Sequence, residues 1–168
     1  FKAYDIRGIV GRTLTPAIAQ LSGRALGSQA RALGQSRVCV GRDARLSGPS
    51  LCEGLARGLQ AAGVDVIDIG QVATPMLYFA TFELRTGSGV MVTGSHNPPD
   101  YNGLKMMIAG DTLSGEAIQR LRTRIEADDF ASGSGSSVKL GPEPAVAGGG
   151  SLSIMGARWR TSELIRYR

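Results

Sequence analysis

A short apolar run, Val90-Met91-Val92, is followed at once by the polar segment TGSHNPPDYNGLK, which spans residues 93–105. An apolar run that stops at Thr-Gly is typical of a buried strand ending in a loop, where open α/β sheets place ligands. Ser95 is therefore expected at the carboxyl end of a strand. Gly94 permits a tight or left-handed turn, and Pro98-Pro99 stiffens the exit. Because the segment is much longer than a turn requires, we interpret it as a functional loop.

Helical and strand-like patterns alternate along the rest of the first 130 residues. Hydroxyl residues before proline, and glycines after apolar repeats, mark the expected helix ends. The expected helices cover residues 15–34, 49–63, 73–84 and 116–127, with Ser114 capping the last. The expected strands cover residues 37–41, 64–69, 88–92 and 104–108, after an extended entry over 1–10 with a turn at Arg7-Gly8. This alternation predicts an α/β domain with a mixed sheet.

Apolar side chains at helical spacing identify the core expected beneath the helices. The first helix supplies Ile18, Leu21, Leu26 and Leu33, the third supplies Leu77, Tyr78, Phe79 and Phe82, and the last supplies Ile118, Leu121 and Ile125. The aromatic side chains of the third helix are therefore expected to pack in the core rather than to surround a cofactor.

The positive charge of the chain does not point to nucleic acid. The formal net charge is +5, but the basic residues are dispersed, and neither an arginine-rich arm nor a base-stacking surface is present. From Ala131 onward, five Lys or Arg residues stand against two Glu residues, so +3 of the charge belongs to that tail. We therefore expect no nucleic-acid partner. The minor alternative, nucleic-acid binding through the basic tail, predicts a steep salt dependence.

The cysteines and the hydropathy indicate a cytoplasmic location. Cys39 lies in a strand-like run and Cys52 in a helical run, and neither has the spacing of a metal site or a disulfide framework. Buried, reduced thiols are expected. No run approaches the roughly 20 apolar residues of a membrane span, and no secretory leader opens the chain. The first residue is Phe1 rather than Met, so the native start is expected upstream.

The loop at 93–105 resembles the active-site serine loop of the α-D-phosphohexomutases, specifically the bacterial phosphomannomutase/phosphoglucomutase group. Three other segments agree with it: FKAYDIRGIVG at the start, VGRDARLSGPSL over 40–51 and VATPMLYFA over 72–80. The resemblance runs from Phe1 to about Phe130. It implies that residues 1–130 form the family's N-terminal, serine-bearing domain, a three-layer α/β/α unit with a mixed, mostly parallel sheet.

The resemblance also implies an isomerase activity in carbohydrate metabolism. Enzymes of this family interconvert hexose 1-phosphate and hexose 6-phosphate by phosphoryl transfer from a phosphoserine. The reaction passes through a hexose 1,6-bisphosphate intermediate, which is also the activator. Ser95 would be the phosphorylated residue, Lys105 the general acid or base, and Arg7 a source of positive charge. His96 would orient a group or handle a proton. Tyr4, Arg7 and Lys105 would contact the phosphosugar, a mannose or glucose phosphate.

Other interpretations of these residues are weaker. A serine hydroxyl is a poor nucleophile at neutral pH, and a Ser-His-Asp hydrolase is the obvious rival because the only histidine, His96, is beside Ser95. Adjacent loop side chains rarely meet in triad geometry, and the GxSxG motif is absent. In the loop at 41–48, Arg42 and Arg45 flank Asp43, which is most simply an ion pair that fixes the shape of the loop.

The resemblance implies Mg²⁺ bound through the phosphate on Ser95, with the remaining ligands elsewhere. The family holds this metal on an aspartate-rich DGDxDR loop of a second domain, and no such run occurs in this sequence. Residues 131–168 are Gly/Ser/Pro-rich and basic, and match none of the family's later domains. We interpret them as a linker or as a truncation or frameshift product.

The chain alone is accordingly expected to be inactive, because sugar recognition in the family lies in the third and fourth domains. The alternative function is a non-catalytic phosphosugar- or partner-binding module with the same fold, which predicts an unmodified Ser95. Neither the preference for mannose or glucose nor the oligomeric state follows from the sequence.

Overall fold

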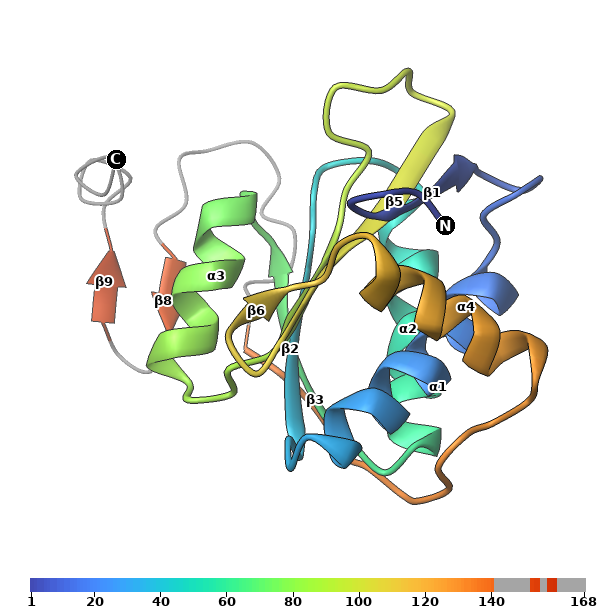
Figure 1. Ribbon diagram of the computed structural model, residues 1–168. Coiled ribbons are helices and arrows are strands. Elements are labelled where there is room, and N and C mark those ends of the chain that lie inside the picture. The colour runs from blue at the N-terminus through green and yellow to red at the C-terminus, as the bar shows by residue number, and fades with distance from the viewer. Residues whose placement is uncertain (141–151, 155–156, 160–168) are drawn as a thin grey trace.

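The computed structural model describes residues 1–140, 152–154 and 157–159 (Figure 1). The helices are α1 (Pro16–Ala32), α2 (Gly48–Ala61), α3 (Thr74–Glu83) and α4 (Glu116–Glu126). The strands of the main sheet are β1 (Ile6–Ile9), β2 (Arg37–Arg42), β3 (Asp65–Gln71), β4 (Gly89–Val92), β5 (Tyr101–Ile108), β6 (Asp111–Thr112) and β7 (Ser137–Lys139). A separate antiparallel pair joins β8 (Leu152–Ile154) and β9 (Ala157–Trp159).

The main sheet is mixed, in the order β1-β5-β4-β2-β3-β7, with β6 paired to β5. Strands β4, β2, β3 and β7 run parallel, because helices cross over between successive strands of this part. Strand β5 returns directly from β4 and pairs antiparallel with both β4 and β1. The predicted α/β fold class with a mixed sheet is confirmed.

The sheet lies between two unequal helical layers. Helices α1, α2 and α4 lie on one side and α3 on the other, as Figure 1 shows. Successive side chains of a strand point to opposite faces, so Val38 and Val40 of β2 join the larger core and Cys39 joins the smaller one. Three layers result, in agreement with the arrangement that the family resemblance implied.

Helices α1 and α2 pack through glycine rather than leucine. A Cβ on Gly23 of α1 would come within 2.3 Å of the Leu55 carbonyl oxygen in α2, so only glycine permits this approach. Leu26 is fully buried as predicted, but Leu21 and Leu33 of the predicted apolar face are 38% and 51% exposed. Small residues, not large ones, therefore form most of the buried face of α1.

Several local predictions are wrong. The expected turn at Arg7-Gly8 is instead the middle of β1, which pairs with β5. Ser114 does not cap α4: the N-cap position is Gly115, and no side chain caps it. Phe82 is 73% exposed because α3 places Leu77, Ala80 and Thr81 against the sheet.

Two other predictions are confirmed within the described residues. Cys39 and Cys52 are buried free thiols. In the predicted stripe of α4, Ile118 and Leu121 are buried and Ile125 is partly buried against the core. None of the helices described is both long and apolar enough to cross a membrane.

Residues 131–140 lie against the domain and contribute β7, which the sequence did not predict. The carbonyl oxygen of Ser136 accepts from the Val66 amide, and the Asp65 carboxylate accepts from the Ser136 amide at 2.6 Å. These contacts add β7 to the edge of β3, from Val66 to Asp68. The remainder of the predicted tail lies mostly outside the described residues, and its interpretation as a linker or truncation product stays a prediction.

Candidate functional site

The serine loop, which we define as residues 93–101, begins where β4 ends at Val92. Strand β2 runs parallel beside β4 and ends at Arg42. Because the carboxyl ends of parallel neighbours meet at one edge of the sheet, the loop that starts at Asp43 lies directly beside the serine loop. Ser95 thus follows a buried strand and is itself exposed, where the sequence analysis placed it.

Ser95 has a left-handed backbone with a φ of 51°, which is uncommon for a residue with a side chain. Its amide donates to Thr93 Oγ1 at 3.0 Å, and the Thr93 hydroxyl donates to Asp43 Oδ2 at 2.8 Å. The Gly94 amide donates to the same carboxylate oxygen at 3.0 Å. Three consecutive residues of the loop are therefore tied, directly or through one hydroxyl, to Asp43.

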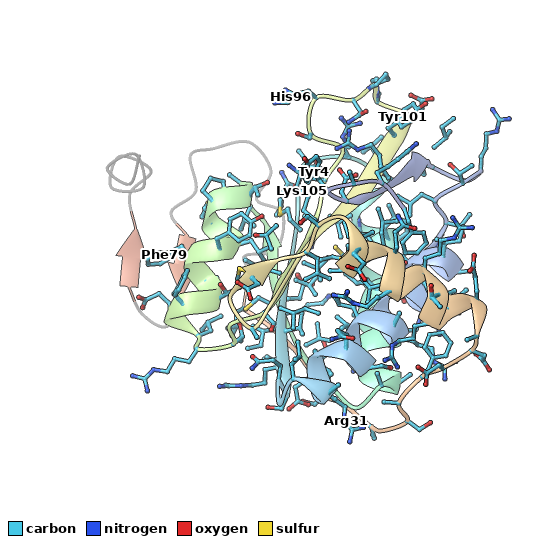
Figure 2. All side chains as sticks on the ribbon, viewed as in Figure 1. Tyr4, Arg31, Phe79, His96, Tyr101 and Lys105 are labelled. Carbon is cyan, nitrogen blue, oxygen red and sulfur yellow. The ribbon has the colours of Figure 1, made fainter. Side chains whose placement is uncertain are left out.

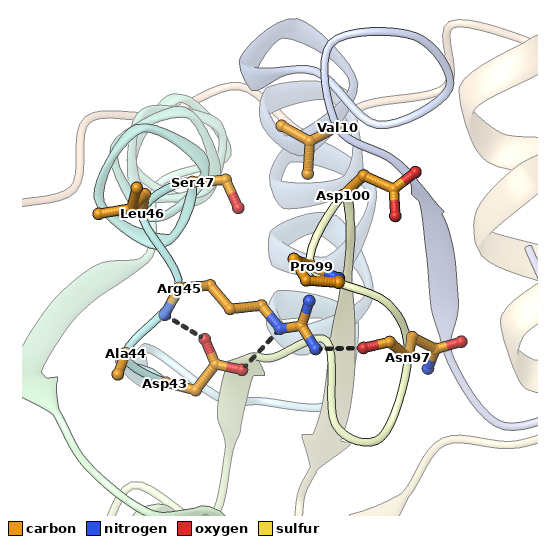
Figure 3. A pocket seen from close by; sticks show the side chains of 9 residues that line it. All are labelled: Val10, Asp43, Ala44, Arg45, Leu46, Ser47, Asn97, Pro99 and Asp100. Carbon is orange, nitrogen blue, oxygen red and sulfur yellow. Dashed lines mark hydrogen bonds and ion pairs between the residues drawn. The ribbon is translucent and has the colours of Figure 1, made fainter.

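Arg45 holds the other half of the loop through backbone carbonyl groups. Its Nη1 donates to Pro98 O at 2.6 Å and to Tyr101 O at 2.9 Å. Its Nη2 donates to Ser95 O at 3.2 Å and to Asn97 O at 2.7 Å. Figure 3 shows the guanidinium between Asp43 and Asn97, with Nε 3.5 Å from Asp43 Oδ2. The ion pair expected within one loop thus also connects two loops.

Arg7 and Lys105 project from the same face of the sheet. Arg7 of β1 pairs with Gly103 of β5, two positions before Lys105. Their neighbours Ile6 and Leu104 are buried in the larger core, so both cationic side chains point to the opposite face. Gly103 carries no side chain between Arg7 and the end of β4. The fold therefore brings together the two cations that the sequence analysis assigned to the site.

Arg7 forms an ion pair with the buried carboxylate of Asp5. Its Nε is buried and has no hydrogen-bond partner among the described residues. Lys105 is half-buried on β5 and makes no hydrogen bond or ion pair within residues 1–140. The guanidinium is therefore fixed at one end and still has a donor free, and the Lys105 ammonium has all of its donors free.

The two remaining predicted site residues are exposed. His96 lies on the outer bend of the serine loop in Figure 2, and Tyr4 is 78% exposed. In the described part of the chain, neither side chain forms a hydrogen bond, and His96 has none to Ser95. The arrangement of a Ser-His-Asp hydrolase is therefore absent from the residues described.

A pocket of about 860 Å³ lies beside the serine loop but contains none of the predicted site residues. Its walls come from the two loops and the end of β1: Val10, Asp43, Ala44, Arg45, Leu46, Ser47, Asn97, Pro99 and Asp100 (Figure 3). We place the candidate site at Ser95, Arg7 and Lys105 rather than in this pocket, because Ser95 is exposed at the end of β4 and the two cationic residues lie on one face of the adjoining strands.

The described residues contain no group of three or more His, Cys, Asp or Glu side chains able to hold a metal ion. A phosphate on Ser95 would supply oxygen ligands, but these residues by themselves do not complete a magnesium site. Three residues that contact a predicted site residue directly were not assigned to the site from sequence: Asp5, Arg45 and Thr93. Asp43 was not assigned to it either, and it reaches Ser95 through the Thr93 hydroxyl. A signal existed for Asp5 and Thr93, since each stands two positions before a predicted site residue on a strand or strand end.

The comparisons with known proteins agree on one family. The sequence model described as phosphoglucomutase/phosphomannomutase, alpha/beta/alpha domain I, matches residues 1–132. A phosphoglucomutase of Neisseria meningitidis serogroup B is 60% identical over 131 residues, which are 78% of this chain and 28% of that protein. A phosphomannomutase/phosphoglucomutase of Pseudomonas aeruginosa PAO1 is 58% identical over 136 residues, 81% of this chain and 29% of that protein.

A solved structure has the same architecture. A phosphoglucomutase/phosphomannomutase family protein of Burkholderia thailandensis superposes with a TM-score of 0.79 at 51% identity, over 82% of this chain and 32% of that one. The chain thus spans less than a third of the length of these relatives. Its sequence and its three-layer fold place this chain in the phosphoglucomutase/phosphomannomutase family, of which it contains domain I.

Proposed function

We propose that this chain is the serine-bearing part of a phosphohexomutase that interconverts hexose 1-phosphate and hexose 6-phosphate. The observation that carries the proposal is the exposed Ser95 side chain on a pinned backbone, with Arg7 and Lys105 facing one side of the adjoining strands. Phosphoryl transfer depends mainly on in-line positioning and on neutralising the phosphoryl oxygens. An exposed hydroxyl on a fixed backbone, with two cations on one face of the adjoining strands, supports both requirements.

In the proposed reaction, a phosphate on Ser95 passes to the free hydroxyl of the bound hexose phosphate. The bond from phosphorus to the serine oxygen breaks, a bond to the sugar oxygen forms, and the proton of the sugar hydroxyl leaves to a base. The resulting hexose 1,6-bisphosphate reorients in the site, so that its other phosphate faces Ser95 and is transferred back to the serine oxygen. Lys105 is the proposed general acid or base, because it is half-buried on the strand beside β4 and makes no ion pair within residues 1–140.

The other site residues have supporting roles in this proposal. The Arg7 guanidinium, whose side chain is 30% exposed, would donate to a phosphate oxygen while Asp5 keeps it in place. Tyr4 and His96 are exposed toward solvent, where they would contact the sugar or handle a proton. Mg²⁺ would bind the phosphate on Ser95 with further ligands from outside residues 1–140. Two free buried thiols support a cytoplasmic location.

A hybrid enzyme tests this function. Residues 1–131 of this chain replace the matching segment of the Neisseria meningitidis phosphoglucomutase, and glucose 1-phosphate is supplied with Mg²⁺ and glucose 1,6-bisphosphate. Formation of glucose 6-phosphate is followed by a coupled dehydrogenase. We expect turnover by the hybrid, a loss of at least about 1,000-fold with Ser95→Ala, and none by the 168-residue chain alone.

Two results would contradict the proposal. Equal activity of the Ser95→Ala hybrid would remove Ser95 from the reaction. A folded hybrid without activity, together with a Ser95 that takes up no phosphate from the bisphosphate, would favour the non-catalytic binding module instead.

A further inference from the structure

Asp43 and Arg45 reach the serine loop from the loop after β2, and the proposed reaction gives neither of them a role. Their partners include Thr93 and Gly94 before Ser95, the carbonyl oxygen of Ser95 itself and that of Asn97 after it. We infer that Asp43 and Arg45 are positioning residues that keep Ser95 in the conformation needed for phosphoryl transfer. The kinetic part of this inference rests on the proposed function, whereas its structural part does not.

Arg45 acts on four carbonyl groups at once. One guanidinium donates hydrogen bonds to the converging carbonyl oxygens of Ser95, Asn97, Pro98 and Tyr101 at distances of 2.6–3.2 Å. Without a cation these oxygens would face one another across the loop. A guanidinium suits this task because its donors form a rigid planar fork, which a lysine ammonium does not provide.

Asp43 acts on the turn that carries Ser95. Its Oδ2 accepts from the Thr93 hydroxyl and from the Gly94 amide. Because the hydroxyl proton of Thr93 is committed to Asp43, an oxygen lone pair remains for the Ser95 amide. This chain of hydrogen bonds holds Ser95 at a φ of 51°, a conformation that side chains disfavour and that persists only when the surroundings enforce it.

Gly94 shows how closely the two loops fit. A Cβ on Gly94 would come within 2.1 Å of Arg45 Nε and 2.2 Å of Arg45 Cζ. The guanidinium therefore occupies the space that any other residue at position 94 would need. Gly94 and Arg45 are thus expected to be coupled: an added methyl group is harmful only while the arginine is present.

Neither side chain belongs to the hydrophobic core, so their loss is expected to spare the fold. The side chains of Arg45 and Asp43 are 17% and 24% exposed, and both lie on loops at the edge of the sheet. Arg57, an exposed arginine of α2 paired with Glu53, supplies the matched control.

The first experiment uses the 168-residue chain and NMR. In Arg45→Ala we expect Ser95 to lose the strong intraresidue NOE between its amide proton and Hα, which marks a positive φ. We also expect the amide protons of Gly94 and Ser95 to exchange faster with solvent. Core amides and the thermal midpoint should match those of the native chain and of Arg57→Ala. An unchanged Ser95 signal and unchanged exchange in Arg45→Ala would overturn the inference, whether or not the proposed function holds.

The second experiment measures kcat and KM in the hybrid enzyme. Arg45→Ala and Asp43→Asn should lower kcat by about 100-fold, the cost of a misplacement of about 1 Å, with KM nearly unchanged. Methylguanidine at millimolar concentration should restore part of the activity of Arg45→Ala but not of Asp43→Asn. If the hybrid without further substitutions has no activity, this counts against the proposed function alone, because the NMR result still tests the inference.

The coupling with Gly94 completes the test. Gly94→Ala should lower kcat by a similar factor in the native hybrid and have little further effect in Arg45→Ala. Independent, multiplicative losses would show that Arg45 does not act through the loop. Full kcat in Arg45→Ala, equal to that of Arg57→Ala, would likewise overturn the inference.

Discussion

Gly58 of α2 faces the carbonyl oxygen of Gln20 in α1, and a Cβ on Gly58 would come within 2.0 Å of that oxygen. Such a contact is impossible without a shift of the backbone, so the two helices would have to separate. Alanine by itself favours a helix over glycine by up to about 1 kcal/mol. The sign of the change in the free energy of unfolding caused by Gly58→Ala therefore shows whether helix propensity or helix packing dominates at this position.

We predict that Gly58→Ala lowers the free energy of unfolding by about 1–3 kcal/mol, because overpacking outweighs the gain in propensity. Urea unfolding measures the change. Glu53→Ala, on the exposed side of the same helix, is the control and should stay within about 0.5 kcal/mol of the native value. A Gly58→Ala variant as stable as the native chain would mean that α1 and α2 can separate at no cost.

Sequence patterns predicted where α1 to α4 and strands β2 to β5 lie along the chain, because these patterns are local. Periodicity reports which residues share a face, but it does not report how close a neighbouring helix comes. Leu21 and Leu33 were therefore assigned to the core, although Gly23, Gly58 and their neighbours bring the helices into contact. Strand β7 was missed for a related reason, since a three-residue segment with two polar residues gains a strand conformation only from pairing with β3.

Helix caps provide a matched pair of predictions, because the sequence indicated two caps and the structure contains one of them. Thr15 Oγ1 accepts from the Ile18 amide at 3.2 Å, whereas Ser114 makes no side-chain cap. Thr15→Ala should lower the free energy of unfolding by about 0.5–2 kcal/mol. Ser114→Ala should change it by less than about 0.5 kcal/mol in the same thermal or urea unfolding assay. Equal losses in the two variants would contradict this assignment.

Some residues of the candidate site could likewise be predicted from the neighbouring sequence, whereas others are recognised only from contacts between distant parts of the chain. Ser95 could be located from the residues around it, because a strand that ends in a long glycine and proline loop is visible in the sequence. Asp43 could not be connected to Thr93 in this way, since the two residues are 50 positions apart and meet only because β2 pairs with β4. Arg45 looked like the partner of Asp43 alone for the same reason.

The thiol of Cys52 is predicted to be unreactive in the folded chain. The side chain is 5% exposed, and burial, assisted by the nearby charge of Asp68, raises the pKa of the thiol to about 12. The nucleophilic thiolate is therefore almost absent at neutral pH. Iodoacetamide at pH 7.5 should leave Cys52 unmodified in the native chain and label it in urea, as peptide mass spectrometry would show. Rapid labelling of the native chain would mean that α2 opens readily.

The contact between Asp65 and Ser136 predicts an acid-sensitive attachment of β7. The Ser136 amide and hydroxyl donate to Asp65 Oδ1 at 2.6 and 2.8 Å, and these hydrogen bonds lower the pKa of Asp65. A lowered pKa in the folded state stabilises the fold above the unfolded-state value of about 3.9, and this contribution is lost as the pH falls through the folded-state pKa. The free energy of unfolding of the native chain, measured in urea, should therefore fall more between pH 7 and pH 3 than that of Asp65→Asn.

The exposed Asp111 supplies the control, because its carboxylate accepts no hydrogen bond in the described residues. Asp111→Asn should keep the acid sensitivity of the native chain. The same loss in Asp65→Asn as in the native chain would show that other carboxylates cause it.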